Sequence, residues 1–344
     1  MSRRAALREL ALLRVRTFLR EPEALFWTFV FPILMAVGLG IAFGGDSMTP
    51  VPVALVEGSA SDAHQAALRA SPELDVRRLS AGGSADALRR GEVDLVLGGT
   101  DSVIYHFDPT RAESRTARLL VDAAIQTAAG ATRPIAVGMA PERQPGSRYI
   151  DWVIPGLIGL NLMSTGMWGI GFGIVNMRQK KQLKRLVATP MRRGDFLLSQ
   201  MAARLAFLAL EVPPLVLFAW LAFDVEVAGS WLDLGVVVLL GTLTFAGLGL
   251  LASSRARTVE GVSGIMNVVM LPMFILSGVF FSARRFPDLI QPVIQLLPLT
   301  ALNDALRGVY NDGRPLVDVS WELLILVGWT ALSALLALRL FRWR

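Results

Sequence analysis

Residues 152–175 read WVIPGLIGLNLMSTGMWGIGFGIV, without a single charged side chain. A helix rises about 1.5 Å per residue, so this stretch is long enough to cross a hydrocarbon layer about 30 Å thick. We therefore interpret it as a membrane-spanning helix.

Apolar runs of similar length recur along the chain, in which 53% of the 344 residues are hydrophobic. The mean hydropathy of +0.51 is too high for a protein whose whole surface is in water. The pattern predicts an α-helical polytopic membrane protein with six transmembrane helices. The predicted spans besides 152–175 are 25–43, 205–223, 234–254, 261–283 and 321–338.

The composition excludes several classes of site. The chain has no cysteine, and its two histidines, His64 and His106, lie far apart, so we expect no metal site. We find no Ser-His-Asp arrangement and predict no catalytic residue. The net charge of +6 could suggest nucleic-acid binding, but basic residues in a membrane protein more often record topology, so no nucleic-acid partner is expected.

The basic residues predict the orientation of the spans. Short cytoplasmic loops collect Lys and Arg, and the loop after the second span contains every lysine of the chain. The loop between spans three and four instead carries Asp224, Glu226 and Asp233. We therefore expect both termini and the segment 176–200 to be cytoplasmic, with the segment 284–312 outside despite its arginines.

The first 24 residues alternate arginines with Leu7, Leu10, Leu13 and Phe18. This pattern favours an amphipathic helix, residues 1–24, at the cytoplasmic interface. A signal peptide is the alternative, but no clear small-residue cleavage site follows the charged region.

Residues 44–148 show a different pattern, in which short β-rich runs alternate with helical ones. It predicts a small α/β extracytoplasmic domain inserted between spans one and two. The expected strands are 51–56, 74–79, 93–97 and 103–107, and the expected helices are 62–70, 85–90 and 111–129.

Residues 178–190, RQKKQLKRLVATP, combine dense positive charge with Leu183, Leu186 and Val187 at helical spacing. One interpretation is a basic loop that only sets topology. We favour a short amphipathic helix that docks a cytoplasmic partner, because its apolar residues recur on one face.

This run resembles the loop between the second and third spans of type-2 ABC exporter permeases, the ABC-2 family. In that family a stretch ending in Thr-Pro forms the coupling helix that touches the ATPase; here it is KRLVATPMRR, residues 184–193. The resemblance implies that a set of residues contacts the ATPase. They are Leu183, Lys184, Arg185, Leu186, Thr189, Pro190 and Arg192.

Residues 276–281 (LSGVFF), 286–289 (FPDL) and 297–307 (LPLTALNDALR) resemble the family's segment after span five, where two short helices dip into the outer leaflet. Residues 87–97 are similar to its extracytoplasmic domain. Prolines spaced through an amphipathic segment suit a re-entrant turn, with an ordinary surface loop as the alternative. The expected outer gate residues are Pro287, Pro298, Leu299 and Arg307.

The resemblance implies the membrane subunit of an ATP-driven exporter in a bacterial inner membrane. Its expected partners are two ABC ATPase subunits that use ATP and Mg, a second permease, identical or homologous, and membrane lipid. The chain lacks the G-x-x-x-x-G-K-[ST] phosphate loop, so we expect it to be no enzyme and to bind no cofactor itself. The alternatives are an ATP-independent transporter or a sensor protein, and, less favoured, an intramembrane or periplasmic enzyme.

Glu211 lies in the middle of the third predicted span, where an ionisable side chain is costly and commonly functional. We leave open whether it serves transport or only structure. A path lined by Met163, Phe172, Asn267 and Phe274, together with Trp168, Phe207 and Met270, would suit an amphiphilic or hydrophobic compound: drug-like, lipid or lipopeptide.

Gly169 and Gly173, with Gly166 and Ser164, form a small-x-x-x-small face on the second predicted span. Such a face lets helices approach closely. We favour packing inside the chain over a dimer contact.

Overall fold

The computed structural model describes residues 25–43, 50–58, 64–99, 102–131, 148–187 and 193–341. The chain divides into two compact units, one of residues Gly45–Glu142 and one that joins Met1–Gly44 to Arg143–Arg344. The predicted interfacial helix, residues 1–24, lies outside the described residues.

The Gly45–Glu142 unit contains a four-stranded sheet in the order β2-β1-β3-β4. Strand β1 (Val51–Val56) pairs in parallel with β2 (Leu74–Leu79) and β3 (Leu95–Gly98), and β4 (Ile104–His106) closes one edge in antiparallel pairing. Each predicted strand has its counterpart; β3 begins two residues later than expected and extends one residue beyond the predicted run.

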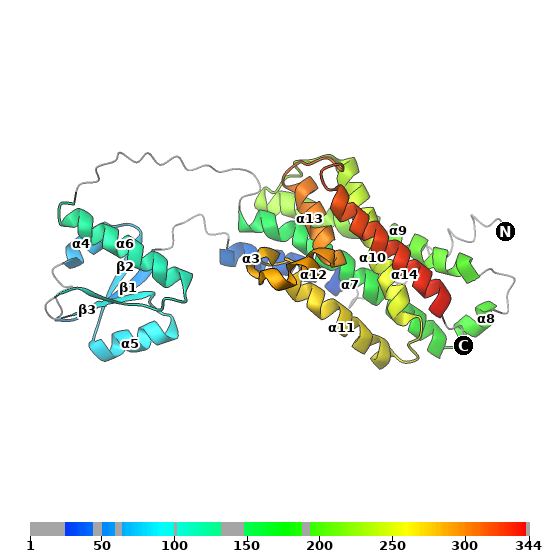
Figure 1. Cartoon of the computed structure of the whole chain (residues 1–344), viewed down its shortest axis with the longest axis horizontal. Helices are drawn as coiled ribbons and strands as arrows, with labels where there is room; N and C mark the ends of the chain where they lie inside the picture. Colours follow the sequence, from blue (N-terminus) through cyan, green and yellow to red (C-terminus); the bar gives the residue numbers. More distant parts are fainter. Residues whose placement is uncertain are drawn as a thin grey trace. The chain divides into compact units, whose positions relative to one another are not determined.

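Helices α4 (Gln65–Ala70) and α6 (Ala112–Ala128) cover one face of the sheet and α5 (Ala81–Arg90) the other, as Figure 1 shows. Successive side chains of a strand point to opposite faces. Accordingly Val53 packs with α4 and α6, whereas Ala54 packs with α5. The alternating pattern thus produces two small cores.

Helix α5 begins four residues before the predicted start at residue 85. The side chain of Ser80 accepts a hydrogen bond from the Gly83 amide and caps the helix at this earlier point. Nearby, Asp94 lies 3.2 Å from Arg111, and burial raises the pKa of its carboxyl while Arg111 opposes the shift.

The other unit is a bundle of long apolar helices. The described residues contain five helices long and apolar enough to cross a membrane, and a sixth if one sharply bent pair counts as a single span. The chain is therefore a multi-pass helical membrane protein. The five are α7 (Tyr149–Gln179), α9 (Arg193–Phe223, apolar from Gln200), α10 (Trp231–Ser253), α11 (Val259–Leu276) and α14 (Ser320–Leu340).

The predicted first span, 25–43, is helical throughout, with a π-helical turn at Phe26–Val30 followed by α3 (Phe31–Phe43). Its strongly apolar part, Thr28–Ile41, is shorter than the other spans. The helix therefore covers the predicted range, but its apolar part is too short to count among the five long apolar helices.

The predicted fifth span, 261–283, extends beyond the end of the observed helix. Helix α11 stops at Leu276, because Ser277 leaves the helix and Gly278 adopts a φ of 71°, a conformation open mainly to glycine. The chain then turns through short helical segments into α12 (Gln291–Leu296).

The predicted re-entrant segment contains a sharp bend, which fits either a re-entrant turn or a broken span. Residues Asp288–Leu296 and Pro298–Tyr310 form two apolar helices bent by 81° at Leu297. The second of these, α13 (Pro298–Tyr310), is buried along almost its whole length among α7, α10 and α14. An ordinary surface loop would not be buried in this way.

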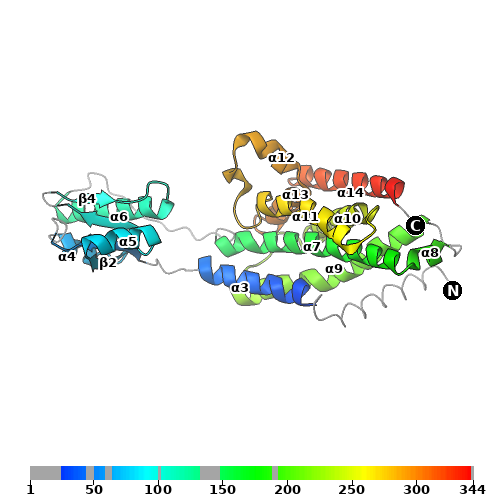
Figure 2. The same ribbon diagram turned by 90° about the horizontal axis from the view of Figure 1, so that it is seen from below.

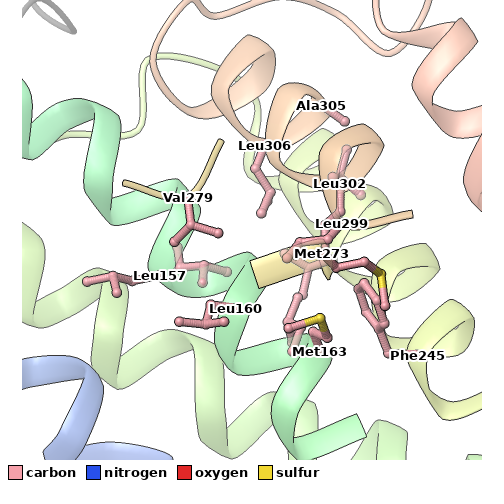
Figure 3. Packing of buried hydrophobic residues seen from close by; sticks show 14 of the residues in the cluster. Leu157, Leu160, Met163, Phe245, Met273, Val279, Leu299, Leu302, Ala305 and Leu306 are labelled. Atoms are coloured by element: carbon pink, nitrogen blue, oxygen red, sulfur yellow. The ribbon is translucent and has the colours of Figure 1, made fainter. Parts of the chain in front are cut away.

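Helix α7 lies in the middle of the bundle. It contacts α3 on one side and α10, α11 and α13 on the other, as Figure 2 shows. Figure 3 shows side chains of α7, α10, α11 and α13 meeting in the apolar core, among them Leu157, Met273 and Leu299. The stretch that is longest and least charged in sequence is thus the central helix.

The glycine face of α7 does not pack as predicted. A side chain at Gly169 or Gly173 would meet no other atom within 4 Å, so these two glycines face open space in the single chain. The close approach occurs instead at Gly166, where a Cβ would lie 2.9 Å from Phe245 of α10. The four-residue spacing thus found a row of small residues on α7, but it did not identify the face of α7 that contacts α10.

The tightest backbone contact between α7 and α10 is at Gly249, where an added Cβ would lie 2.8 Å from the Met167 carbonyl oxygen. We expect Gly249→Ala to destabilise the bundle by about 1–3 kcal/mol, since backbone atoms cannot move aside. Thermal unfolding in detergent measures this. Gly235→Ala on the same helix meets nothing within 4 Å and is the control, and equal melting temperatures for the two variants would contradict the prediction.

Candidate functional site

The segment predicted to dock a partner contains a short helix, α8 (Gln182–Val187), directly after α7. Its Leu183 side chain is only 1% exposed and packs in a cluster with Ile174 of α7, Leu250 of α10 and Phe341 after α14. Leu183 therefore faces the bundle rather than a partner, and it seats α8 on the membrane helices.

Two predicted partner contacts, Lys184 and Arg185, are exposed on α8. The turn before the helix uses Lys181 at a φ of 57°, which changes the direction of the chain after α7. The side chain of Leu186 and all of Thr189, Pro190 and Arg192 lie outside the described residues. The described part of α8 thus offers one apolar side chain inward and two cations outward.

Arg178, in the last turn of α7, binds the end of another span. Its guanidinium donates to the carbonyl oxygens of Ser253 at 2.9 Å, Ser254 at 3.1 Å and Ala256, all at the C-terminal end of α10. It also lies over the ring of Phe341, 5.5 Å from its centroid. Helix C-termini have unpaired carbonyls and a partial negative charge, which a cation satisfies.

Arg307 makes the equivalent contact at the opposite end of the bundle. It is a predicted gate residue on α13, and its guanidinium donates to the Gly278 carbonyl just past α11 and lies 3.5 Å from the ring centroid of Trp152. Asn303, one turn earlier, donates to the Ser277 carbonyl at 3.0 Å. Helix α13 therefore caps the C-terminal end of α11.

The other predicted gate residues divide between core and surface. Pro298 and Leu299 are buried in the first turn of α13, whereas Pro287 is exposed. Trp329 of α14 donates to the Leu296 carbonyl at 2.9 Å, next to the 81° bend. The bend is thus held by packing and by a side chain from the last span.

Arg148, at the start of α7, forms a third contact of this kind. It donates to the carbonyls of Phe223 at 3.0 Å and Asp224 at 3.1 Å, at the C-terminal end of α9. It also binds the carboxylate of Asp151, which is buried. Arginines on α7 or against it therefore cap three different spans.

Glu211 has a partner that the sequence analysis did not find. Both of its carboxylate oxygens accept hydrogen bonds from Arg204, two turns earlier on α9, at 2.6 and 2.7 Å. The Glu211 side chain is 2% exposed and that of Arg204 6%. The spacing of seven residues, which returns to the same helix face, is the signal that could have revealed the pair.

This ion pair is connected to two other helices. The Thr165 hydroxyl of α7 lies 3.1 Å from Glu211 and 2.7 Å from the Asn161 carbonyl, and Arg204 donates to it. The Asn161 amide donates in turn to the Thr28 carbonyl at 3.1 Å. A buried polar network therefore links α9, α7 and the first helix.

The predicted path residues do not come together in the single chain. Met163 is buried in the core, and Phe172 stacks on Trp168 with ring centroids 4.7 Å apart. Asn267 and Phe274 are exposed on α11, seven residues apart and hence on one face. These two could line a path only with a further surface opposite them.

A sequence model described as ABC-2 family transporter protein matches residues 22–339. The chain belongs to this family. Its members are permease subunits of ABC transporters, which are not enzymes themselves and work with an ATPase partner. The family match covers the bundle and the Gly45–Glu142 unit together.

Curated relatives agree with this assignment. Nodulation protein J of Rhizobium meliloti (strain 1021) is 25% identical over 209 residues, covering 60% of this chain and 79% of that protein. The inner membrane transport permease YadH of Escherichia coli (strain K12) is 23% identical over 188 residues, 53% of this chain and 72% of that protein. The putative transport permease YvfS of Bacillus subtilis (strain 168) is 25% identical over 179 residues, with coverages of 52% and 71%.

The buried ion pair of the ABC-2 chain predicts a specific pattern of stability. Glu211→Ala leaves Arg204 as an unpaired buried cation, so we expect a loss of about 3–5 kcal/mol in the free energy of unfolding. The double change Arg204→Met with Glu211→Leu removes both charges and should recover most of that loss. Thermal unfolding in detergent compares them, and a double variant as unstable as Glu211→Ala would contradict the prediction.

Proposed function

We propose that this chain is the permease of an ATP-driven exporter in a bacterial inner membrane. It moves an amphiphilic or hydrophobic compound, drug-like, lipid or lipopeptide, out of the cytoplasm or the inner leaflet. The observation that carries the proposal is α8: a short helix fixed to the bundle by Leu183, with Lys184 and Arg185 directed outward, in a chain of the ABC-2 family.

The charge distribution supports an orientation for the bundle. All of the lysines lie just after the C-terminal end of α7 or on α8, and Asp224 at the opposite end of the bundle lies beside Arg148. Under the positive-inside rule α8 and both termini are cytoplasmic. The re-entrant helices and the Gly45–Glu142 unit are then extracytoplasmic.

The proposed complex contains two ATPase subunits, which use ATP and Mg, and two permeases, identical or homologous. The exposed face of α11 supports the second permease, because Asn267 would face hydrocarbon if that helix were bounded by lipid alone. A second permease opposite this face would enclose Asn267 and Phe274 in a cavity between the subunits. Met163, which is fully buried, supports the helix packing instead.

The docking role of α8 is tested by charge reversal. We expect Lys184→Glu with Arg185→Glu to weaken association with the ATPase about tenfold or more, since like charges would then face an acidic partner surface. Co-purification and a titration of labelled ATPase in detergent measure the affinity. Arg284→Glu with Arg285→Glu makes the same change in charge on exposed residues after α11, at the other end of the bundle, and serves as the control.

Equal affinities for the two reversed pairs would refute docking through α8.

A transport assay separates the proposal from an ATP-independent carrier. In inverted vesicles, uptake of an amphiphilic dye should need ATP in the cognate complex and persist when the proton gradient is collapsed. Uptake driven by the gradient without ATP would support the carrier instead.

The substrate class has its own test. We expect Asn267→Leu and Phe274→Ala to change which amphiphiles stimulate ATP hydrolysis by the complex, because both positions would face the cavity. Leu324→Ala, on an exposed apolar position of α14, is the control for a lipid-facing change. Transport of sugars or ions alone would remove the assignment of an amphiphilic substrate.

A further inference from the structure

The contact of Arg178 with α10 goes beyond what a topological signal requires. A basic residue that only fixes orientation needs no defined partner, yet this guanidinium binds the carbonyls of Ser253, Ser254 and Ala256. Its planar fork has several donors in fixed directions, which allows three acceptors to be held at once. The contact is therefore a specific joint between two helices.

This joint between α7 and α10 lies beside the apolar cluster on which α8 packs. Arg178 is in the last turn of α7, and α8 begins four residues later. Leu183 packs into the same cluster as Leu250 of α10 and Phe341, and Arg178 lies over the Phe341 ring. The proposed ATPase docking element and the end of α10 thus share one packed cluster.

The joint also controls where α11 begins. Ala256 is buried, and Thr258 caps the first turn of α11 by accepting a hydrogen bond from the Gly261 amide at 3.1 Å. Only a few residues separate the carbonyls bound by Arg178 from this cap. A shift of the α10 C-terminus therefore moves the start of α11.

The far end of α11 is held by the re-entrant helix. Its last carbonyls, at Ser277 and Gly278, accept hydrogen bonds from Asn303 and Arg307 of α13. The end of α10 that Arg178 binds thus lies just before the start of α11, and α13 binds the carbonyls just past the end of α11.

We propose that Arg178 is a positioning residue that transmits displacement of α8 to the α10–α11 junction, and through α11 to the re-entrant helix α13. The inference rests on the proposed function and specifies the route by which ATPase movement reaches the outer segment. Helix α11 runs without a break over 18 residues, so a displacement at its start is passed along it toward Ser277, with Pro272 as the position where it can bend. Loss of Arg178 leaves ATPase docking intact but uncouples ATP hydrolysis from export.

The functional test uses the assembled complex with Arg178→Gln, Arg178→Lys and Arg255→Gln. We expect Arg178→Gln to retain ATPase association and hydrolysis while export per ATP falls about tenfold, the effect of losing charge-assisted hydrogen bonds. Arg178→Lys should be intermediate, because an ammonium is a point charge without the fork. Arg255→Gln, an exposed arginine in the same loop, should match the native ratio.

The structural test measures the joint directly. The chain has no cysteine, so Gln182→Cys and Arg257→Cys place spin labels on α8 and on the α10–α11 connection without background. Both positions are exposed. We expect one narrow distance distribution with and without a non-hydrolysable ATP analogue. In Arg178→Gln the distribution should broaden or shift with the nucleotide, because the two sites move independently.

A native export ratio together with an unchanged distance distribution in Arg178→Gln would overturn the inference. If Arg178→Gln fails to assemble with the ATPase, Arg178→Lys is measured instead. A native export ratio and a native distance distribution in Arg178→Lys would then overturn the inference. Failure of the proposed function looks different, because the native complex itself would not bind the ATPase or would transport without ATP.

Discussion

The constraint on which the bundle depends is that backbone carbonyls at the ends of buried helices must find donors where water is scarce. An unpaired carbonyl in such a place costs about 1–3 kcal/mol. This chain meets the demand with arginines on α7 or against it. Arg148 binds the end of α9, Arg178 the end of α10 and Arg307 the end of α11.

This arrangement ties the ends of α9, α10 and α11 to α7 or to side chains packed against it. Its apolar faces pack against α10 and α13, while its two ends and its middle carry the polar contacts. The middle contact, Thr165, reaches the buried pair of Arg204 and Glu211. Each of these buried charged side chains thus has several hydrogen-bond partners, as expected for a low-dielectric interior.

The same contacts connect the two ends of the molecule. Helix α8 is packed on the bundle through Leu183, and helix α13, at the opposite end, binds the end of α11 through Asn303 and Arg307. A permease must respond outside to an event inside. In the proposed route Arg178, bound to several carbonyls, carries this response from α8 to the end of α10.

The sequence by itself determined the membrane class, five of the spans and the strand pattern of the inserted segment, because hydropathy and alternation are local properties. It also located the segment that bends between α12 and α13 and the short helix after α7. Which side chains contact one another was decided only by the tertiary structure. That Glu211 pairs with Arg204, that Leu183 faces inward and that Gly166 rather than Gly169 meets α10 depend on how helices rotate and approach. Those rotations are set by packing between segments distant in sequence, which no local pattern encodes.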